Sequence, residues 1–511
     1  MRLPFKTFLG WSPRLGRLNP VMIAGMLLLW AGCTVGPDYV RPPTAAPAAY
    51  KEAPGWKVAQ PRDELSRGPW WEVYGDPQLN ALEEQVDINN QNIAAAEAQF
   101  RQALALVKEA RAAYFPTVTA GPSWTRFSNS STLVSSSVMG TGAAGTTSTG
   151  ARPSAVSAPT TSQYLLTSDL TWEPDLWGKV RRQVESSKAS AQASAADLEG
   201  VRLSARATLA QDYFQLRTLD EQKRLLNDTV ADYQKVLVFT KNEYAQGVAS
   251  RADVAIAETQ LKSTQAQAIA VGVQRAQTEH AIAVLLGKSP SVFAIPVVRQ
   301  TMRVPEVPFG VPSELLERRP DIAAAERNMA AANAEIGVAL AAYYPTITLS
   351  ASGGFETISL AKWLTWPSRL WSLGAAASET VLDFGLRSGQ TAAARASYDA
   401  SVATYRQTVL TGFQQVEDNL AALGILKNEA QMQNEAVRAA RESLAVSTNQ
   451  YEAGTISRIT LLVVETVALT NEITANTIMG SQMTAHVLLI EALGGGWQSS
   501  DLPAVGWEPP I

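Results

Sequence analysis

Two long stretches of the chain contain no proline, from 175 to 289 and from 368 to 502, and hydrophobic positions seven residues apart run through the first. In the first stretch the heptad positions are Val184, Ala191, Leu198 and Ala205, then Leu209 with Leu216 and Leu219 with Leu226. Such spacing is typical of a coiled-coil-like seam between helices. The segment 179–246 is predicted to form one helix on the order of 100 Å long, which a globular monomer does not need.

A second pattern, with period two, occurs in shorter segments that are therefore predicted to be β-strands. Apolar and polar residues alternate in 164–172 and 346–351, and the segments 116–127 and 371–382 complete two pairs of strands. Nearby tryptophans favour a transmembrane barrel, although a sheet that faces water has a similar pattern. Four strands cannot close a barrel in lipid, so two, three or four chains would have to contribute strands.

The chain is internally duplicated. The matching segments are 92–97 with 321–326 and 113–117 with 342–346 at one offset, then 244–251 with 451–458 at a shorter offset. The first copy therefore has extra residues between 117 and 178. They fall in a stretch rich in Ser, Thr, Gly and Ala, 128–162, which is predicted to be a long external loop between two strands.

Each copy is predicted to contain a helical hairpin with a tight turn. Gly247 and Gly454 can end the long helices, and Ser250 and Ser457 can cap the helices that follow. These return helices, 252–286 and 459–493, are about half as long as their partners. Shorter helices at 78–112 and 321–342 could stack end to end with them and restore the length.

Composition and charge exclude several functions. The formal net charge is −4, so the chain lacks the basic excess that general nucleic-acid binding requires. It has only two histidines, His280 and His486, and no phosphate-binding loop, clustered metal ligands or nucleophile elbow. We therefore expect neither an enzyme nor a cofactor.

The N-terminus has the features of a targeting segment. Basic residues precede an apolar run, 21–30, which is too short to cross a bilayer as a helix and indicates a signal peptide. Small residues then lead to Cys33, the single cysteine of the chain. The sequence Leu29-Trp30-Ala31-Gly32-Cys33 resembles a bacterial lipobox, although Trp30 stands where leucine is usual. We expect Cys33 to be acylated and to begin the mature chain, and multiple acyl chains would anchor it stably.

Together these motifs resemble the TolC/OprM-type outer membrane factors, in particular the NodT-like efflux lipoproteins. The matching residues are Cys33-Thr34-Val35-Gly36-Pro37-Asp38-Tyr39, the paired Ala-Tyr-aromatic-Pro-Thr segments, Arg319-Pro320-Asp321, both Tyr-x-x-Gly turns and Leu493-Gly494-Gly495-Gly496-Trp497. The resemblance covers nearly all of the chain from 33 to 497.

The resemblance implies a fold that is mainly α with a transmembrane β part. Three copies of the chain would close a 12-stranded β-barrel in the outer membrane on a 12-helix periplasmic tunnel. It implies a lipid-anchored exit duct of a tripartite efflux system, which passively conducts drugs or toxic compounds. The implied partners are a periplasmic adaptor, an inner membrane transporter of the RND type and outer membrane lipid. Apart from the lipid on Cys33, no cofactor is implied.

We expect the following division of the chain. Residues 1–32 form the signal peptide, 33–76 the lipid-anchored tail, 77–290 the first half, 291–310 a linker, 311–497 the second half and 498–511 a C-terminal tail.

In this family the tunnel closes at its periplasmic end, and the resemblance assigns gate positions here to Asp253, Tyr451, Thr460 and Val463. The last two stand where the family pattern has aspartates, and Ile456 replaces an expected arginine. Arg458 and Glu465 lie nearby but are expected on helical faces different from those of Thr460 and Val463. We therefore predict a more apolar closure.

The turns of the hairpins are the predicted adaptor contacts, formed by Gly247, Ser250, Arg251, Gly454, Ser457 and Arg458. Two alternatives to drug efflux stay open at this point. The same fold could serve as a type I protein secretion duct. A lipid-anchored coiled-coil scaffold would explain the helices and Cys33 but not two symmetrically placed strand pairs.

Overall fold

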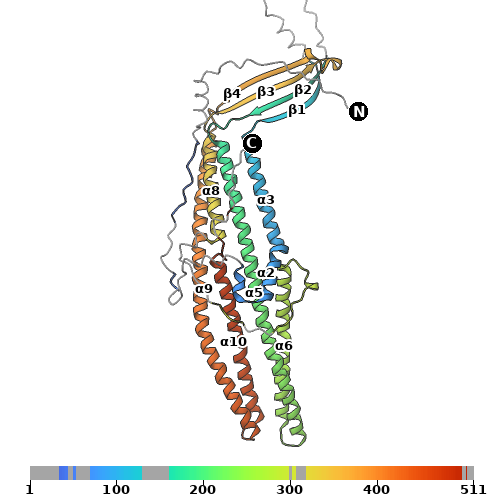
Figure 1. Ribbon diagram of the computed structural model, residues 1–511, viewed down its shortest axis with the longest axis vertical. Coiled ribbons are helices and arrows are strands. Elements are labelled where there is room, and N and C mark those ends of the chain that lie inside the picture. The colour runs from blue at the N-terminus through green and yellow to red at the C-terminus, as the bar shows by residue number, and fades with distance from the viewer. Residues whose placement is uncertain are drawn as a thin grey trace, which may run out of the picture. The chain divides into compact units, whose positions relative to one another are not determined.

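The computed structural model describes residues 34–43, 50–52, 69–128, 160–298, 302–305, 318–497 and 502. They are mostly helical (Figure 1) and belong to two compact units. One unit, Met1–Asp38, Val107–Ser186 and Asn333–Ala396, contains the sheet, and the other contains the helical hairpins. Within the described part of the chain, no helix has both the length and the apolar character needed to cross a membrane.

Four strands form one antiparallel sheet in the order in which they occur along the chain. They are β1 (Thr117–Ser128), β2 (Thr160–Trp172), β3 (Thr346–Thr357) and β4 (Arg369–Ser378). All four predicted strands are present, but β4 ends before the predicted 382. The residues after it form a loop, in which the N–H of Gly385 donates to Asp383 at 3.0 Å and Glu379 accepts from Arg387 of the following helix at 2.9 Å.

The strand register gives the sheet one apolar and one polar face, because residues paired across neighbouring strands lie on the same face. On one face the paired row is Val118, Leu170, Ala351 and Leu373. On the other face it is Thr119, Asp169, Ser352 and Ser372. The alternation read from the sequence is therefore present in the sheet.

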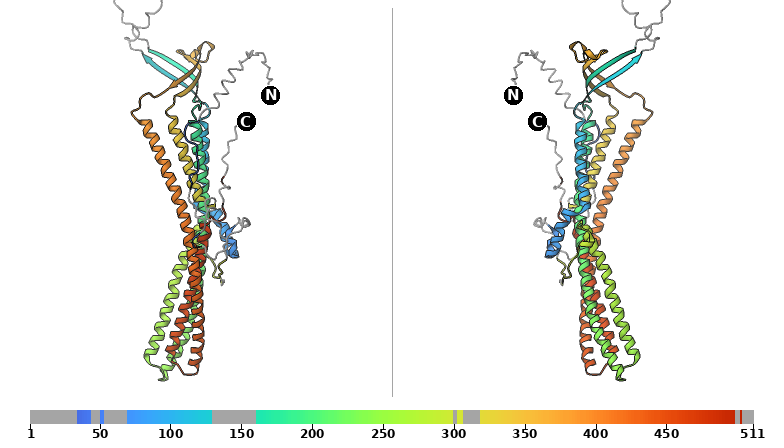
Figure 2. Two further views of the ribbon diagram at one scale, coloured as in Figure 1. Left: turned by 90° about the vertical axis from the view of Figure 1, so that its left-hand side faces the viewer. Right: turned by 90° about the vertical axis from the view of Figure 1, so that its right-hand side faces the viewer.

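Two helical hairpins, apart from the first residues of their long helices, form the core of the other unit. They are α5 (Lys179–Ala245) with α6 (Arg251–Leu285), and α9 (Leu386–Glu452) with α10 (Arg458–Ala492). Figures 1 and 2 show the turns of both hairpins at the same end of this unit. Every predicted heptad position from Val184 to Leu226 is buried, which confirms the predicted seam.

The shorter helices α3 (Gln91–Ala112) and α8 (Pro320–Ala341) continue the return helices α6 and α10 end to end, as predicted, whereas α2 (Pro77–Asn89) packs beside α5. The Asn90 side chain donates to Leu285 O at 2.9 Å, and Arg319 donates to Ala492 O at the equivalent place in the second copy. The segment 78–112 is not one helix, however. Asn90 ends α2 and caps α3, because its Oδ1 accepts the N–H of Asn92 at 2.9 Å.

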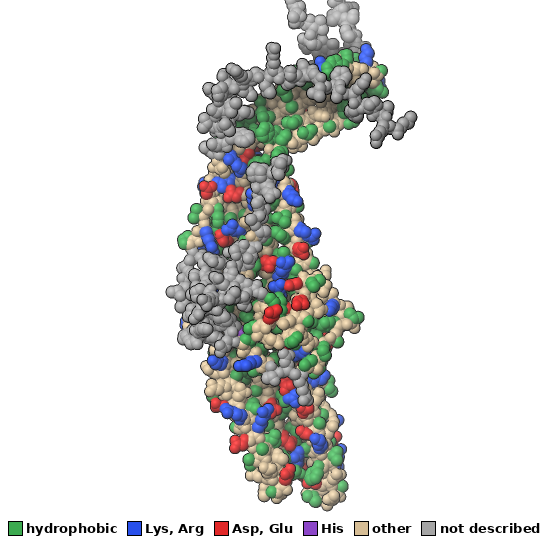
Figure 3. Space-filling model, in the orientation of Figure 1, with side chains coloured by type: hydrophobic (Ala, Val, Ile, Leu, Met, Phe, Trp, Pro, Cys, Tyr) green, Lys and Arg blue, Asp and Glu red, His purple; other side chains and the backbone are tan. Residues whose placement is uncertain are grey.

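Two apolar clusters hold the helices together. One joins η2 (Trp70–Tyr74) and α2 to Leu209, Tyr213 and Leu216 of α5, and the other is built largely from α9 with the end of α10. Figure 3 shows charged side chains of both signs scattered over the helices, whereas the visible face of the sheet is mostly hydrophobic or uncharged. On the visible face, the helices therefore present charged side chains beside scattered hydrophobic ones.

Candidate functional site at the hairpin ends

Each hairpin turn is closed around one glycine with a left-handed backbone. Gly247 has φ 80° and Gly454 has φ 73°, a region that residues with a Cβ rarely adopt. The N–H of Val248 donates to Glu243 O at 2.9 Å, and the N–H of Thr455 donates to Gln450 O at the same distance. The two copies therefore end their long helices in the same way, as the sequence predicts.

The two return helices begin with related but different caps. Ser250 accepts the N–H of Asp253, and the Asp253 carboxylate accepts the N–H of Ser250 at 2.8 Å, which completes a capping box. These hydrogen bonds lower the pKa of Asp253. In the second copy Ser457 accepts the N–H of Thr460, and their hydroxyls lie 3.0 Å apart. Asp253 and Thr460 thus both have a local role at a helix start.

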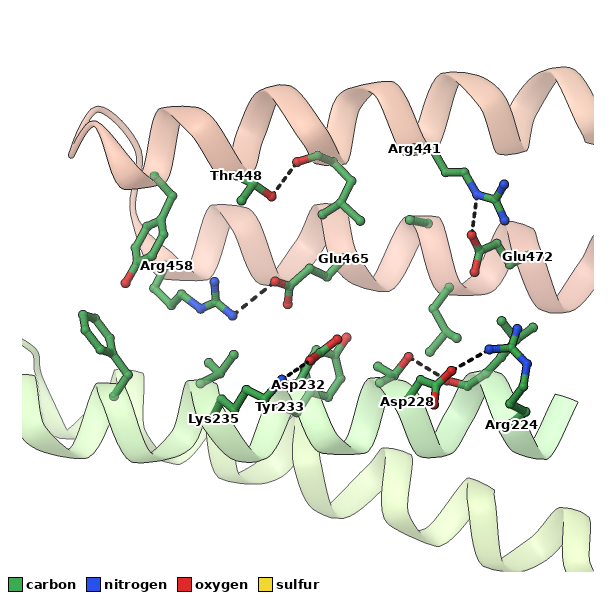
Figure 4. A pocket seen from close by; sticks show the side chains of 18 residues that line it. Arg224, Asp228, Asp232, Tyr233, Lys235, Arg441, Thr448, Arg458, Glu465 and Glu472 are labelled. Carbon is green, nitrogen blue, oxygen red and sulfur yellow. Dashed lines mark hydrogen bonds and ion pairs between the residues drawn. The ribbon is translucent and has the colours of Figure 1, made fainter. Parts of the chain in front are cut away.

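A groove of about 800 Å³ separates α5 from the α9–α10 hairpin just beyond the turns (Figure 4). Its walls carry charges of both signs together with aromatic and aliphatic side chains. The lining residues are Arg224, Leu225, Asp228, Thr229, Asp232, Tyr233, Lys235, Val236, Phe239, Arg441, Leu444, Thr448, Tyr451, Arg458, Glu465, Ala468, Leu469 and Glu472. The groove therefore lies between the two sequence repeats.

A chain of contacts crosses the groove near its end. Arg458 pairs with Glu465 at 3.1 Å on α10, and its guanidinium carbon lies 5.2 Å from the ring centre of Tyr451 on α9. Tyr451 in turn meets Phe239 of α5 edge to face, with ring centres 6.4 Å apart. Burial raises the pKa of Glu465, and Arg458 opposes that shift. The arginine therefore holds both a partly buried carboxylate and the aromatic ring that faces the other hairpin.

A second link between the hairpins is made by hydroxyl and amide groups. The hydroxyl of Thr466 on α10 lies 3.0 Å from the Tyr233 hydroxyl on α5 and accepts from Gln260 of α6 at 3.2 Å. Tyr233 is fully buried. Thr466 therefore joins three helices at one atom.

The structure brings two of the four predicted gate residues to one hollow. Tyr451 and Asp253 both line a second space of about 570 Å³ nearer the turns, whose other lining residues include Ile256, Ile456 and Leu462. Thr460 takes part in the helix cap, and Val463 is exposed on α10.

Sequence reasoning missed the pairing of Arg458 with Glu465. They are seven residues apart, which returns to nearly the same face after two turns, and their side chains form an ion pair. Sequence reasoning also missed Phe239, Tyr233 and Thr466. Their partners lie in the other repeat, and no local motif marks them.

The predicted adaptor contacts differ in exposure between the two copies. Gly247, Ser250, Arg251, Gly454 and Ser457 are exposed at the turns. Arg458 is only partly exposed, because its side chain turns into the groove and pairs with Glu465. The two arginines are therefore not equivalent surfaces. Cys33, the predicted lipidation site, lies outside the described residues.

The chain matches the family model described as outer membrane efflux protein over residues 82–288 and 311–495. It is 30% identical over 484 residues to a pyoverdine export outer membrane protein, OpmQ, of Pseudomonas aeruginosa, covering 94% of this chain and 97% of the relative. It is 28% identical over 481 residues to the toluene efflux pump outer membrane protein TtgC of Pseudomonas putida, covering 93% and 95% respectively.

Solved structures share the fold over almost the whole chain. The outer-membrane channel OprN superposes with a TM-score of 0.80 at 30% identity, covering 91% of this chain and all of that one. The outer membrane channel CmeC of Campylobacter jejuni reaches 0.83 at 20% identity, with 92% and 96% covered. The fold is thus that of outer-membrane channels, which confirms the predicted fold class.

The extent of these matches settles the family. The chain belongs to the outer membrane efflux protein family. Its four strands and paired hairpins are the parts of that fold that one chain supplies.

Proposed function

We propose that the chain is the outer membrane exit duct of a tripartite efflux system and works as a homotrimer. The observation that carries this proposal is the sheet, which has one apolar face and two edge strands, in a chain of the efflux family. In lipid every backbone N–H and C=O needs a partner, so an open sheet edge is excluded there. Pairing β1 of one copy with β4 of the next closes the edges, and three copies give twelve strands.

The two faces of the sheet support this assignment. Large apolar side chains on the face of Val118 and Leu373 are exposed, among them Trp124 and Trp371. Membrane strands place apolar residues toward lipid and polar residues toward the lumen. We assign the face of Thr119 and Asp169 to the lumen of the duct.

The cargo proposed for the duct consists of small toxic organic compounds. The relatives are named for toluene efflux, antibiotic efflux and pyoverdine export, all of which concern small molecules rather than proteins. Conduction through the duct is passive, so the energy comes from an inner membrane transporter of the RND type. A periplasmic adaptor connects the two and contacts the exposed turns around Gly247, Arg251 and Gly454.

The groove and the hollow beside it are the proposed periplasmic gate. Tyr451 is its central residue, because it lines both spaces and faces Phe239 across the repeat. Asp253 lines the hollow, and Thr460 and Val463 lie at the start of the same helix as Arg458. Two contacts that join the hairpins, Tyr451 with Phe239 and Tyr233 with Thr466, are made by aromatic rings and hydroxyl groups rather than by acidic pairs. They support a more apolar closure, although charged side chains line the groove.

Lipidation of Cys33 is the proposed anchor in the outer membrane. It rests on the lipobox-like sequence before Cys33. Mass spectrometry of the mature N-terminal peptide tests it, since an unmodified Cys33 would refute it.

Deletion of the gene tests the proposed cargo. The deletion strain should become more susceptible to organic solvents and antibiotics, and the intact gene should restore resistance. Unchanged susceptibility together with loss of a secreted protein would favour the protein secretion alternative. A purified chain that forms no heat-sensitive trimer would contradict the duct itself.

A further inference from the structure

A buried arginine, Arg182, makes several hydrogen bonds to the residues that follow Cys33. Arg182, near the start of α5, has a side chain that is only 4% exposed. Its Nε donates to Val35 O at 3.2 Å, and its Nη2 donates to Gly36 O at 3.2 Å and to the Asp38 carboxylate at 2.8 Å. Its Nη1 donates to Glu185 at 2.7 Å. All three nitrogens of the guanidinium are therefore used, and most of them hold the segment 34–38.

Three glycines allow the backbone of segment 34–38 to pack closely against its surroundings. A Cβ on Gly36, whose φ is 101°, would lie 2.5 Å from Gly337 Cα. A Cβ on Gly337 would lie 2.7 Å from Arg182 Cγ, and one on Gly178 would lie 2.9 Å from Thr34 Cγ2. A side chain at any of these three positions would displace a neighbouring atom, so the segment is closely packed in this site.

Further hydrogen bonds extend the contact in both directions. The N–H of Val35 donates to Trp177 O at 3.2 Å, and the buried side chain of Asn333 donates to Pro37 O at 3.0 Å. Trp177 in turn donates from its ring to Pro345 O at 2.7 Å and stacks on Tyr344, directly before β3. The segment is thus bound to the structure at the base of the strands.

The backbone carbonyls, and not the acidic side chain, dominate this contact. The Asp38 side chain is 93% exposed, so its ion pair with Arg182 contributes little. The carbonyls of Val35 and Gly36 need the fixed fork of a guanidinium, which lysine does not provide. Hydrogen bonds to a charged donor are worth roughly twice those between neutral groups.

We propose that Arg182, Gly178 and Gly337 form a built-in docking site for segment 34–38, and that this site holds the start of the mature chain independently of the acyl group. The position of the lipid rests on the proposed acylation of Cys33: because Thr34 directly follows Cys33, an acyl group there is tethered one Cα–Cα step, ~3.8 Å, from the docked segment. The docking site therefore limits how far the lipid can move from segment 34–38.

A spin label tests the proposal. Pro37 is exposed and uses its backbone carbonyl for the contact, so Pro37→Cys gives a label site on the segment. The electron paramagnetic resonance spectrum of the label is recorded in the lipidated protein and in a Cys33→Ser protein. The latter is exported with a signal peptide whose cleavage does not require lipidation. We expect an immobilised spectrum in both. Adding Arg182→Ala should abolish the immobilised component in both, while mass spectrometry still shows the lipid where Cys33 is present.

Two further variants keep the result interpretable. Gly36→Ala disturbs the contact from the segment side and leaves α5 intact, so it should also mobilise the label even if Arg182→Ala folds poorly. Gln183→Ala, next to Arg182 on an exposed position, should leave the spectrum unchanged. A label that is mobile in Cys33→Ser with Arg182 intact would show that the lipid holds the segment. An immobile label in both Arg182→Ala and Gly36→Ala would equally overturn the proposal.

Discussion

Replacement of Arg458 by alanine is predicted to open the proposed gate. The change removes the cation from the Tyr451 ring and leaves the partly buried Glu465 carboxylate without its ion-pair partner. Loss of a cation–π contact costs about 1 kcal/mol, and an unpaired polar group that is mostly buried costs about 1–3 kcal/mol. The side chains of Arg458 and Glu465 are each about one fifth exposed, and solvent weakens their interaction. We therefore expect the substitution to cost about 2 kcal/mol in total.

The direction of the effect of Arg458→Ala distinguishes a role in closing the gate from a role within helix α10 alone. Arg458 is the first residue of α10, where the helix dipole disfavours a positive charge. If the arginine had only a local role, its removal would slightly stabilise the helix. If Arg458 makes these contacts only while Tyr451 lies against the other hairpin, the loss of about 2 kcal/mol falls on the closed state alone and shifts the closed–open equilibrium about thirtyfold toward the open state.

Single-channel recording in planar bilayers measures this shift as open probability. The matched control is Arg441→Ala, because Arg441 pairs with Glu472 in the same groove but is 64% exposed, and exposed pairs contribute about 0.5 kcal/mol. Acidification should reduce the Arg458→Ala effect, since burial already raises the pKa of Glu465 and a protonated Glu465 needs no cation. Equal effects of the two substitutions, or none from Arg458→Ala, would refute the reasoning.

Three further predictions concern other groups. Thr466→Val removes the hydroxyl that links Tyr233 and Gln260 and should raise the open probability about fivefold, for a loss of about 1 kcal/mol, whereas Thr466→Ser should not. Burial raises the pKa of Glu83 from 4.5 to about 9, so its carboxyl group stays protonated in the folded protein at pH 7. The free energy of unfolding is therefore highest below pH 4.5 and falls as the pH rises toward 9. Glu83→Gln should remove this pH dependence and raise the free energy of unfolding by about 3 kcal/mol at pH 7. Urea unfolding at several pH values measures the gain, and an equal gain at every pH would contradict the prediction. Arg251→Glu should weaken cross-linking to the adaptor without changing conductance, and intact cross-linking would remove Arg251 from the docking surface.

The elements with strong local signals could be predicted from the sequence. The heptad positions, the four strands, both glycine turns and the end-to-end stacking of the short helices follow from periodicity and from the duplication. The break at Asn90 could not be predicted, because neither proline nor glycine marks it. It depends on the Asn90 amide reaching Leu285 at the end of a helix far along the chain.

The site was less predictable than the fold, because its contacts join different repeats. Tyr451 was found through its place in the turn motif, but its partner Phe239 has no motif of its own. The pairing of Arg458 with Glu465 was missed although their spacing allows it. The role of Arg182 is also invisible in sequence, since its partners are backbone carbonyls.

Three copies of this chain are proposed to form a conducting duct. Conductance recordings of the purified trimer in a planar bilayer, beside those of the Arg458→Ala trimer, test this most directly. We expect discrete conductance steps from the native trimer, which is closed most of the time, and a much larger open fraction in the variant. A folded trimer that inserts into the bilayer and gives no steps in either form would contradict the proposed duct.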